Sequence, residues 1–326
     1  MIITAYEVRG DEQADFEYWG EKLGLTIRYY KEPLSLENLS TAEGSDAITI
    51  LGHSHMDQKL LDGIKEKGIF FLATRTIGYN HIDLEYAKKI GVRISNSHYA
   101  PNGVAEYTIM LILMSLRHYK QALYRGNVND YSLRGLQGRE LRNLTVGIVG
   151  TGKIGYQVIE NLQGFGCRIL AYDTFQRSDM GKKAEYVNLE TLYRECDIIS
   201  LHTPLLDSTY HMIDKRALEK MKDGVVLVNC ARGELMNIPD IIEGVESEKI
   251  GALGLDVFEK EDGIYHEDRR CDIISNRDMA YLRQFRNVTM TQHMAFYTDA
   301  AVSSMVEGAI LSLDSFYRTG SSSYEL

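Results

Sequence analysis

The sequence lacks several features that mark particular classes of protein. Its four cysteines (Cys167, Cys196, Cys230 and Cys271) lie far apart and form no CxxC pair, which argues against a zinc or thiol-redox site. The longest apolar stretch, residues 107–116, is about half as long as a membrane-spanning helix needs to be. The opening residues read as a strand rather than as a signal peptide. We therefore expect a cytoplasmic protein with no membrane partner and no bound metal.

An excess of positive charge is also missing. The chain has 36 lysines and arginines against 46 aspartates and glutamates, a formal net charge of −10. Such a surface repels phosphate backbones, so nucleic acid is a poor candidate partner. The length of 326 residues, with 44% hydrophobic and 25% charged residues, is typical of a globular protein with two domains.

Short apolar runs alternate with amphipathic stretches along the chain, which predicts an α/β fold with parallel sheets. The expected strands lie at residues 2–6, 47–51, 70–73, 92–94, 145–149, 168–172, 198–202, 225–229, 252–257 and 288–291. The expected helices lie at residues 11–23, 58–67, 84–90, 102–119, 156–165 and 300–316, and residues 321–326 are expected to fray. The strands fall into two series, the second beginning near residue 144, which indicates two α/β domains.

The helix expected at 102–119 is apolar almost all round in its centre, YTIMLILMSL. Such a helix must be buried on several sides. Two explanations fit equally well at this point. The helix lies either at an interface between domains or subunits, or deep in the core of one domain.

The segment LTVGIVGTGKIG carries a dinucleotide-binding motif. Gly150, Gly152 and Gly155 have the G-x-G-x-x-G spacing between an apolar strand and an amphipathic helix, which is the context that the motif requires. The helix N-terminus supplies amide donors for a pyrophosphate. Asp173 follows the next strand, where its carboxylate would accept hydrogen bonds from ribose hydroxyls and repel a 2′-phosphate. NAD is therefore favoured, and nearby Arg177 keeps NADP as the alternative.

Three polar residues stand at the carboxyl ends of later strands, where open α/β sheets bind ligands. They are Arg232 in VNCARGE, Glu261 in LDVFEKE and His293 in MTQHMAFYT. Arginine holds a carboxylate with a planar fork, histidine transfers protons near neutral pH, and a neighbouring carboxylate favours the imidazolium. Singly each residue has an ordinary structural explanation, but together they form a hydride-transfer site for a 2-oxo acid.

Seven segments, in this order, resemble one family. They are TRTIGYNHID (74–83), YAPNGVAEYT (99–108), VGIVGTGKIG (146–155), LHTPL (201–205), VNCARGE (228–234), LDVFEKE (255–261) and QHMAFYT (292–298). Over nearly its whole length the chain resembles the D-isomer-specific 2-hydroxyacid dehydrogenases, most closely the D-lactate dehydrogenase branch, including its vancomycin-resistance type.

The resemblance implies roles by position. Arg232 would bind the substrate, His293 would be the acid/base and Glu261 would pair with it. Ile77, Gly78, Tyr99 and Tyr297 would complete the substrate site. The residues expected at the cofactor are Gly150, Gly152, Lys153, Ile154, Gly155, Asp173, Thr203, Pro204, Thr209, Cys230, Ala231, Arg232 and Asp256.

The resemblance also implies two Rossmann-like or flavodoxin-like domains with the active-site cleft between them. The substrate domain would be discontinuous, at 1–99 plus 297–326, with the NAD-binding domain at 100–296 and a homodimer as the assembly. Pyruvate is the expected substrate, reduced with NADH to D-lactate. Bulkier acids such as 2-oxoisocaproate or phenylpyruvate are the alternative, and a non-catalytic NAD-sensing scaffold is an alternative of another class.

Overall fold

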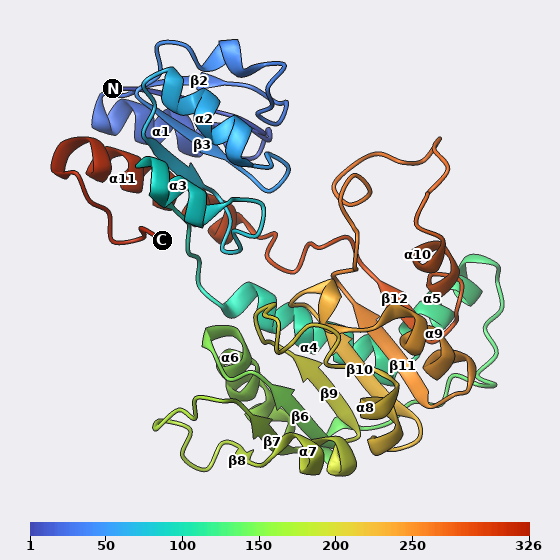
Figure 1. Ribbon diagram of the computed structural model, residues 1–326. Helices are drawn as coiled ribbons and strands as arrows, with labels where there is room; N and C mark the ends of the chain where they lie inside the picture. The colour runs from blue at the N-terminus through green and yellow to red at the C-terminus, as the bar shows by residue number, and fades with distance from the viewer. The chain divides into compact units, whose positions relative to one another are not determined.

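The chain folds into two compact units, and the computed structural model describes residues 1–326. Unit 1 combines Met1–Ala100 with Tyr297–Leu326, and unit 2 comprises Pro101–Phe296. Each unit is built on a parallel sheet with helices packed against it (Figure 1). The predicted α/β fold class is therefore confirmed.

Unit 1 has five parallel strands in the order β2-β1-β3-β4-β5. The strands are β1 (Ile2–Ala5), β2 (Thr26–Tyr29), β3 (Ala47–Ile50), β4 (Phe71–Thr74) and β5 (Arg93–Ser95). The central strand β3 has the mostly apolar sequence AITI and is buried along its whole length, as expected of a parallel strand covered on both faces.

Helices cover both faces of this sheet. The helices are α1 (Gln13–Leu23), α2 (Gln58–Glu66), α3 (Leu84–Ile90) and α11 (Asp299–Thr319), with a 3₁₀ turn at Leu39–Ala42. Helices α1 and α11 share one core with the sheet, and α2 and α3 share the other. Helix α11 comes from the far end of the chain, yet it packs on β4 and α1 (Figure 1).

Unit 2 has seven parallel strands in the order β12-β11-β10-β9-β6-β7-β8. The strands are β6 (Thr145–Val149), β7 (Arg168–Tyr172), β8 (Glu185–Tyr186), β9 (Ile198–Leu201), β10 (Val225–Asn229), β11 (Ile250–Leu255) and β12 (Val288–Met290). The helices are α4 (Asn102–Leu116), α5 (Tyr119–Asn127), α6 (Lys153–Leu162), α7 (Leu189–Glu195), α8 (Lys215–Lys220), α9 (Ile238–Glu246) and α10 (Arg277–Leu282), and 3₁₀ turns lie at Leu141–Asn143, Gln163–Phe165 and Gly233–Leu235. Since every strand is parallel, all the carboxyl ends lie at one edge of the sheet.

The strongly apolar helix α4 is a core helix of unit 2. It packs against α6, β10 and β11, and eight of its 15 residues are buried. The predicted helix over 102–119 ends earlier, at Leu116, because His118 has a left-handed φ of 50° that separates α4 from α5. None of the helices is both long enough and apolar enough to cross a bilayer.

Most predicted strands are confirmed to within two residues at either end, and three of them match in both limits. The prediction missed β2, an edge strand whose residues are all at least partly exposed, because it lacks an apolar run. It also missed the two-residue strand β8, helix α5 and the short helices α7 to α10.

The C-terminal tail is paired, and the prediction that residues 321–326 fray is wrong. Glu325 forms an antiparallel bridge with Ser95, and the Leu326 amide donates to the Ile94 carbonyl at 3.0 Å. The Arg93 guanidinium also pairs with the Glu325 carboxylate. The tail thus supplies hydrogen-bond partners to the outer edge of strand β5. No local sequence pattern reveals a pairing over such a long distance along the chain.

Candidate active site

The glycine-rich turn between β6 and α6 has the geometry that a pyrophosphate site needs. Gly150 has a φ of 94°, which glycine adopts without strain. A Cβ on Gly155 would lie 1.9 Å from the carbonyl oxygen of Gly150, so glycine is required for the helix to pack this closely. A Cβ on Gly152 would meet no atom within 4 Å. The amides of Lys153 and Ile154, which begin α6, therefore adjoin open space where phosphates can bind.

Asp173 follows β7 and lies beside this turn. Its carboxylate accepts hydrogen bonds from the backbone amides of Thr151 at 2.6 Å and Phe175 at 2.9 Å. Partial burial opposes ionisation, but these hydrogen bonds outweigh it and hold the pKa of Asp173 below its usual value. An ionised carboxylate at this place accepts from ribose hydroxyls and repels a 2′-phosphate.

Arg177, which kept NADP open as an alternative, is occupied elsewhere. Its guanidinium donates two hydrogen bonds to Asp179, at 2.9 and 2.7 Å. The same group lies over the ring of Tyr156, 4.1 Å from the ring centroid. Asp179 and Tyr156 thus already engage the positive charge of Arg177, so the residues present fit NAD.

The remaining residues expected at the cofactor follow three neighbouring strands at the same sheet edge. They are Thr203, Pro204 and Thr209 after β9, Cys230 and Ala231 after β10, and Asp256 after β11. The Thr209 hydroxyl donates to the Pro204 carbonyl at 2.7 Å and so holds the loop after β9. Burial raises the pKa of the Cys230 thiol, which makes this side chain a neutral, apolar part of the wall.

Glu261 and His293 form a hydrogen-bonded pair at this edge. Glu261 Oε1 contacts Nδ1 of His293, and Glu261 Oε2 accepts from the backbone amide of Phe258 at 2.7 Å. The carboxylate therefore orients the imidazole through one ring nitrogen. The other nitrogen, Nε2, is left to exchange a proton with a substrate.

Arg232 reaches the same region through the turn after β10. A Cβ on Gly233 would lie 2.1 Å from the backbone of Phe258, so this turn packs directly on the loop that carries Glu261. Of the five guanidinium N–H donors of Arg232, the protein uses one, from Nη1 to the Ala231 carbonyl at 2.6 Å. The rest are available to an anionic ligand.

Asp256 anchors the turn that carries His293. The Asp256 side chain is completely buried, and it accepts from Thr291 Oγ1 at 2.7 Å and from the amides of Met294 at 3.0 Å and Ala295 at 2.8 Å. Its carbonyl accepts from the His293 amide at 2.6 Å, and His293 has a left-handed φ of 52°. This anchoring is not predictable from the sequence, because its only signal is an acid directly after a strand.

The turn that holds Ile77 and Gly78, two of the residues expected at the substrate, lies in unit 1, after β4. Asn96 Nδ2 donates to the Ile77 carbonyl at 2.8 Å, and Thr76 Oγ1 donates to the Gly78 carbonyl at 2.6 Å. The carbonyls are therefore bound within the protein, whereas the amides of Ile77 and Gly78 have no partner in it. A turn of this kind offers two N–H donors to an anion.

The two expected tyrosines also belong to unit 1. Tyr99 is half-buried after β5. Tyr297 lies beside the loop that follows β1, where the Arg9 guanidinium is 5.3 Å from its ring centroid and a hydrogen bond with Asp11 raises its pKa. Unit 1 thus holds Ile77, Gly78, Tyr99 and Tyr297, and unit 2 holds the catalytic candidates and the cofactor residues.

Residues 109–295 match the family model of the D-isomer specific 2-hydroxyacid dehydrogenase, NAD binding domain. The chain belongs to this family. It is therefore an oxidoreductase, and its cofactor is NAD.

Relatives of this dehydrogenase family carry several names. The chain is 43% identical to an aromatic 2-oxoacid reductase of Clostridium sporogenes, over 98% of this chain and 97% of that protein. It is 33% identical to the D-lactate dehydrogenase of Escherichia coli, over 96% of each. A solved D-2-hydroxyisocaproate dehydrogenase superposes with a TM-score of 0.90 at 31% identity, over 100% of this chain and 99% of that one. These names agree on the reaction class and differ in the side chain of the acid.

Proposed function

We propose that this dehydrogenase reduces 2-oxo acids to D-2-hydroxy acids with NADH, and that an aromatic or large aliphatic side chain is preferred. The observation that carries the reaction is the Glu261–His293 pair, at the sheet edge that also holds Arg232 and the dinucleotide turn. The preference for a large side chain rests on the higher identity to the aromatic 2-oxoacid reductase than to the D-lactate dehydrogenase.

Each residue has a distinct chemical role in this proposal. Bound NADH supplies the hydride for the carbonyl carbon. Protonated His293 gives the proton at Nε2 to the carbonyl oxygen, and Glu261 stabilises the charged imidazole before that transfer. Arg232 holds the substrate carboxylate and stabilises negative charge on the carbonyl oxygen. The amides of Ile77 and Gly78 are the proposed second contact for the carboxylate.

Pyruvate is the second candidate substrate. It was the substrate expected from the sequence motifs, and full-length similarity to a D-lactate dehydrogenase supports it. Pyruvate carries a methyl group and phenylpyruvate a benzyl group, and these groups differ mainly in apolar area. Comparing the two acids therefore tests how much space the pocket offers beyond the reacting carbonyl.

An assay of NADH oxidation tests both parts of the proposal. Phenylpyruvate, 2-oxoisocaproate and pyruvate are compared by kcat/KM, and we expect the highest value with phenylpyruvate. NADH should be preferred over NADPH by about tenfold or more, which needs only about 1.4 kcal/mol of repulsion between Asp173 and the 2′-phosphate. In the reverse direction, only the D isomer of phenyllactate should be oxidised. Absence of turnover with all three acids would refute the enzymatic function and favour a scaffold.

We also propose that the protein is a homodimer. Apolar side chains project into solvent from α5 and the segment after it; the most exposed are Tyr124 (70%), Val128 (59%), Tyr131 (77%) and Leu133 (83%). An exposed apolar group of this kind is typical of a protein interface. The basis for the dimer thus moves from residues 107–116, most of which are buried within unit 2, to α5 and the residues that follow it.

Sedimentation tests the assembly. We expect twice the chain mass of 37.0 kDa for the wild type, and the monomer mass for a variant with Tyr131→Ser and Leu133→Ser. A wild type that sediments as a monomer at micromolar concentration would contradict the dimer.

A further inference from the structure

The strand order of unit 1 creates a point where two loops diverge. Strands β1 and β3 are neighbours, but the chain leaves β1 toward β2 on one side and leaves β3 toward β4 on the other. Open α/β sheets bind ligands at the carboxyl ends of such a pair. In this unit the two loops are residues 6–12 after β1 and residues 51–57 after β3.

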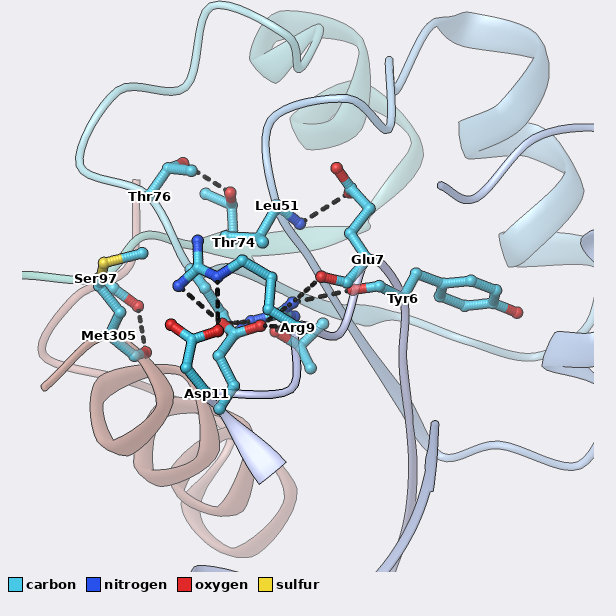
Figure 2. Close-up of polar contacts among 12 residues, drawn as sticks. Tyr6, Glu7, Arg9, Asp11, Leu51, Thr74, Thr76, Ser97 and Met305 are labelled. Atoms are coloured by element: carbon cyan, nitrogen blue, oxygen red, sulfur yellow. Dashed lines mark hydrogen bonds and ion pairs between the residues drawn. The ribbon is translucent and has the colours of Figure 1, made fainter. Parts of the chain in front are cut away.

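Glu7 bridges these two loops. Its buried carboxylate accepts hydrogen bonds from the backbone amides of Leu51 at 2.8 Å and His53 at 2.7 Å, and from the Ser54 hydroxyl at 2.6 Å. The Ser54 oxygen in turn accepts from the Leu34 amide at 2.9 Å. Figure 2 shows Glu7 extending from the β1 loop to the amide of Leu51. A single side chain thus accepts hydrogen bonds from three of the four residues 51–54.

The backbone of Glu7 is itself held firmly. Glu7 has a left-handed φ of 57°, an uncommon conformation for a residue with a Cβ. Nη2 of Arg75 donates to the carbonyls of Tyr6 at 2.9 Å and Glu7 at 3.2 Å. Arg75 is fully buried and paired with the buried Glu12 carboxylate at 2.8 Å. The Arg75–Glu12 ion pair thus holds the backbone of Glu7 in place. The position of the Glu7 carboxylate, and of the loop residues bonded to it, follows from this backbone.

The 51–54 loop also adjoins the turn proposed to hold the substrate carboxylate. That turn, Ile77 and Gly78, follows β4, and β4 pairs with β3. Adjacent strands are about 4.8 Å apart, a distance that a 2-oxo acid spans only from its carboxylate carbon to the outer carbons of an extended side chain. A substrate anchored after β4 therefore directs its side chain toward the loop after β3.

We propose that Glu7 is a positioning residue that sets the place of residues 51–54 and, through them, the selectivity between large and small 2-oxo acids. This role rests on the proposed function above. The effect should depend on substrate size, because the methyl group of pyruvate is too short to reach the loop and a benzyl group is long enough.

The substitution Glu7→Gln tests the proposal. The two carboxylate oxygens serve different donors, Oε1 for the His53 amide and Oε2 for the Leu51 amide and Ser54. Glutamine keeps only one acceptor oxygen, so at least one buried donor loses its partner. We expect the ratio of kcat/KM for phenylpyruvate to that for pyruvate to fall by about tenfold, the scale of one lost buried hydrogen bond. The NADH affinity and the kcat with pyruvate should stay within about twofold of wild type.

Asp46→Asn is the matched control. Asp46 also accepts a backbone hydrogen bond in unit 1, from Ile2 at 2.6 Å, but at the opposite, amino edge of the sheet. The Asp46→Asn variant should leave the ratio of kcat/KM for phenylpyruvate to that for pyruvate unchanged. Ser54→Ala, which removes only the hydroxyl, should shift the ratio in the same direction as Glu7→Gln by a smaller factor. This variant replaces Glu7→Gln in the test if Glu7→Gln fails to fold.

Hydrogen exchange of the amides supplies a readout that needs no activity. In the Glu7→Gln variant, or in Ser54→Ala if that variant is used, exchange at Leu51 and His53 should become faster, while exchange in β6 and β10 stays unchanged. Unchanged exchange in the loop, or an equal loss of kcat/KM for both acids, would overturn the role of Glu7 alone. A wild type without turnover would refute the proposed function instead, and the selectivity role with it.

Discussion

The variant His293→Asn is expected to lower kcat with every 2-oxo acid by about 10²- to 10⁴-fold, the usual contribution of a general acid. Asparagine adopts the left-handed backbone conformation of His293 readily, so the turn after β12 keeps its shape. The change therefore removes the imidazole and little else. Stopped-flow measurement of single-turnover NADH oxidation, together with NADH titration by fluorescence, separates the chemical step from cofactor binding.

The control for this variant is His118→Asn. His118 has nearly the same backbone conformation, with a φ of 50°, and it lies between α4 and α5, near Asn287 at the amino end of β12. It should retain wild-type kcat. If His293→Asn instead weakened NADH binding while the single-turnover rate stayed normal, the proton-transfer role would be wrong and His293 would be a cofactor contact.

The second large effect is expected for Arg232→Gln. Removing one partner of a desolvated charge pair costs about 2–5 kcal/mol or more, so kcat/KM for 2-oxo acids should fall by at least about 30-fold. Arg232→Lys should recover part of this loss, since lysine restores the charge without the planar fork. Steady-state kinetics with both variants measures the difference.

Arg194→Gln provides the matched arginine control for that experiment. Arg194 is 66% exposed and faces Glu195 at 3.7 Å on the surface of unit 2, so its loss should leave kcat/KM unchanged. A kcat/KM for Arg232→Gln within a few-fold of wild type would show that the substrate carboxylate is bound elsewhere. In that case the Ile77–Gly78 turn would be the main candidate for the carboxylate-binding site.

Local patterns predicted the elements that surround the site. The run ending at Asn229 and the glycine motif at Gly150–Gly155 each combine a buried strand with a chemically distinctive turn, so their limits are visible in a short window of sequence. Parallel pairing then brings such turns to one edge by topology alone. This is why Glu261 and His293, 32 residues apart, could be grouped before their contact was seen.

Residues that act through long-range hydrogen bonds were not predictable in this way. Glu7 lies 44 residues from Leu51, and Asp256 lies 39 residues from Ala295. Each looks like an ordinary acid in its local sequence. Their roles depend on which buried amides would otherwise lack an acceptor, and only the folded backbone supplies that information.

The return of α11 to unit 1 has a consequence for how the chain folds. The core shared by α1 and the sheet is closed by Val306, Ile310 and Phe316 of α11, which are synthesised after the whole of unit 2. Unit 2 is continuous in sequence and can complete its core during synthesis, whereas unit 1 must keep an apolar face uncovered until the last helix leaves the ribosome. The high sequence separation of these contacts makes closure of unit 1 the slow, late step of folding.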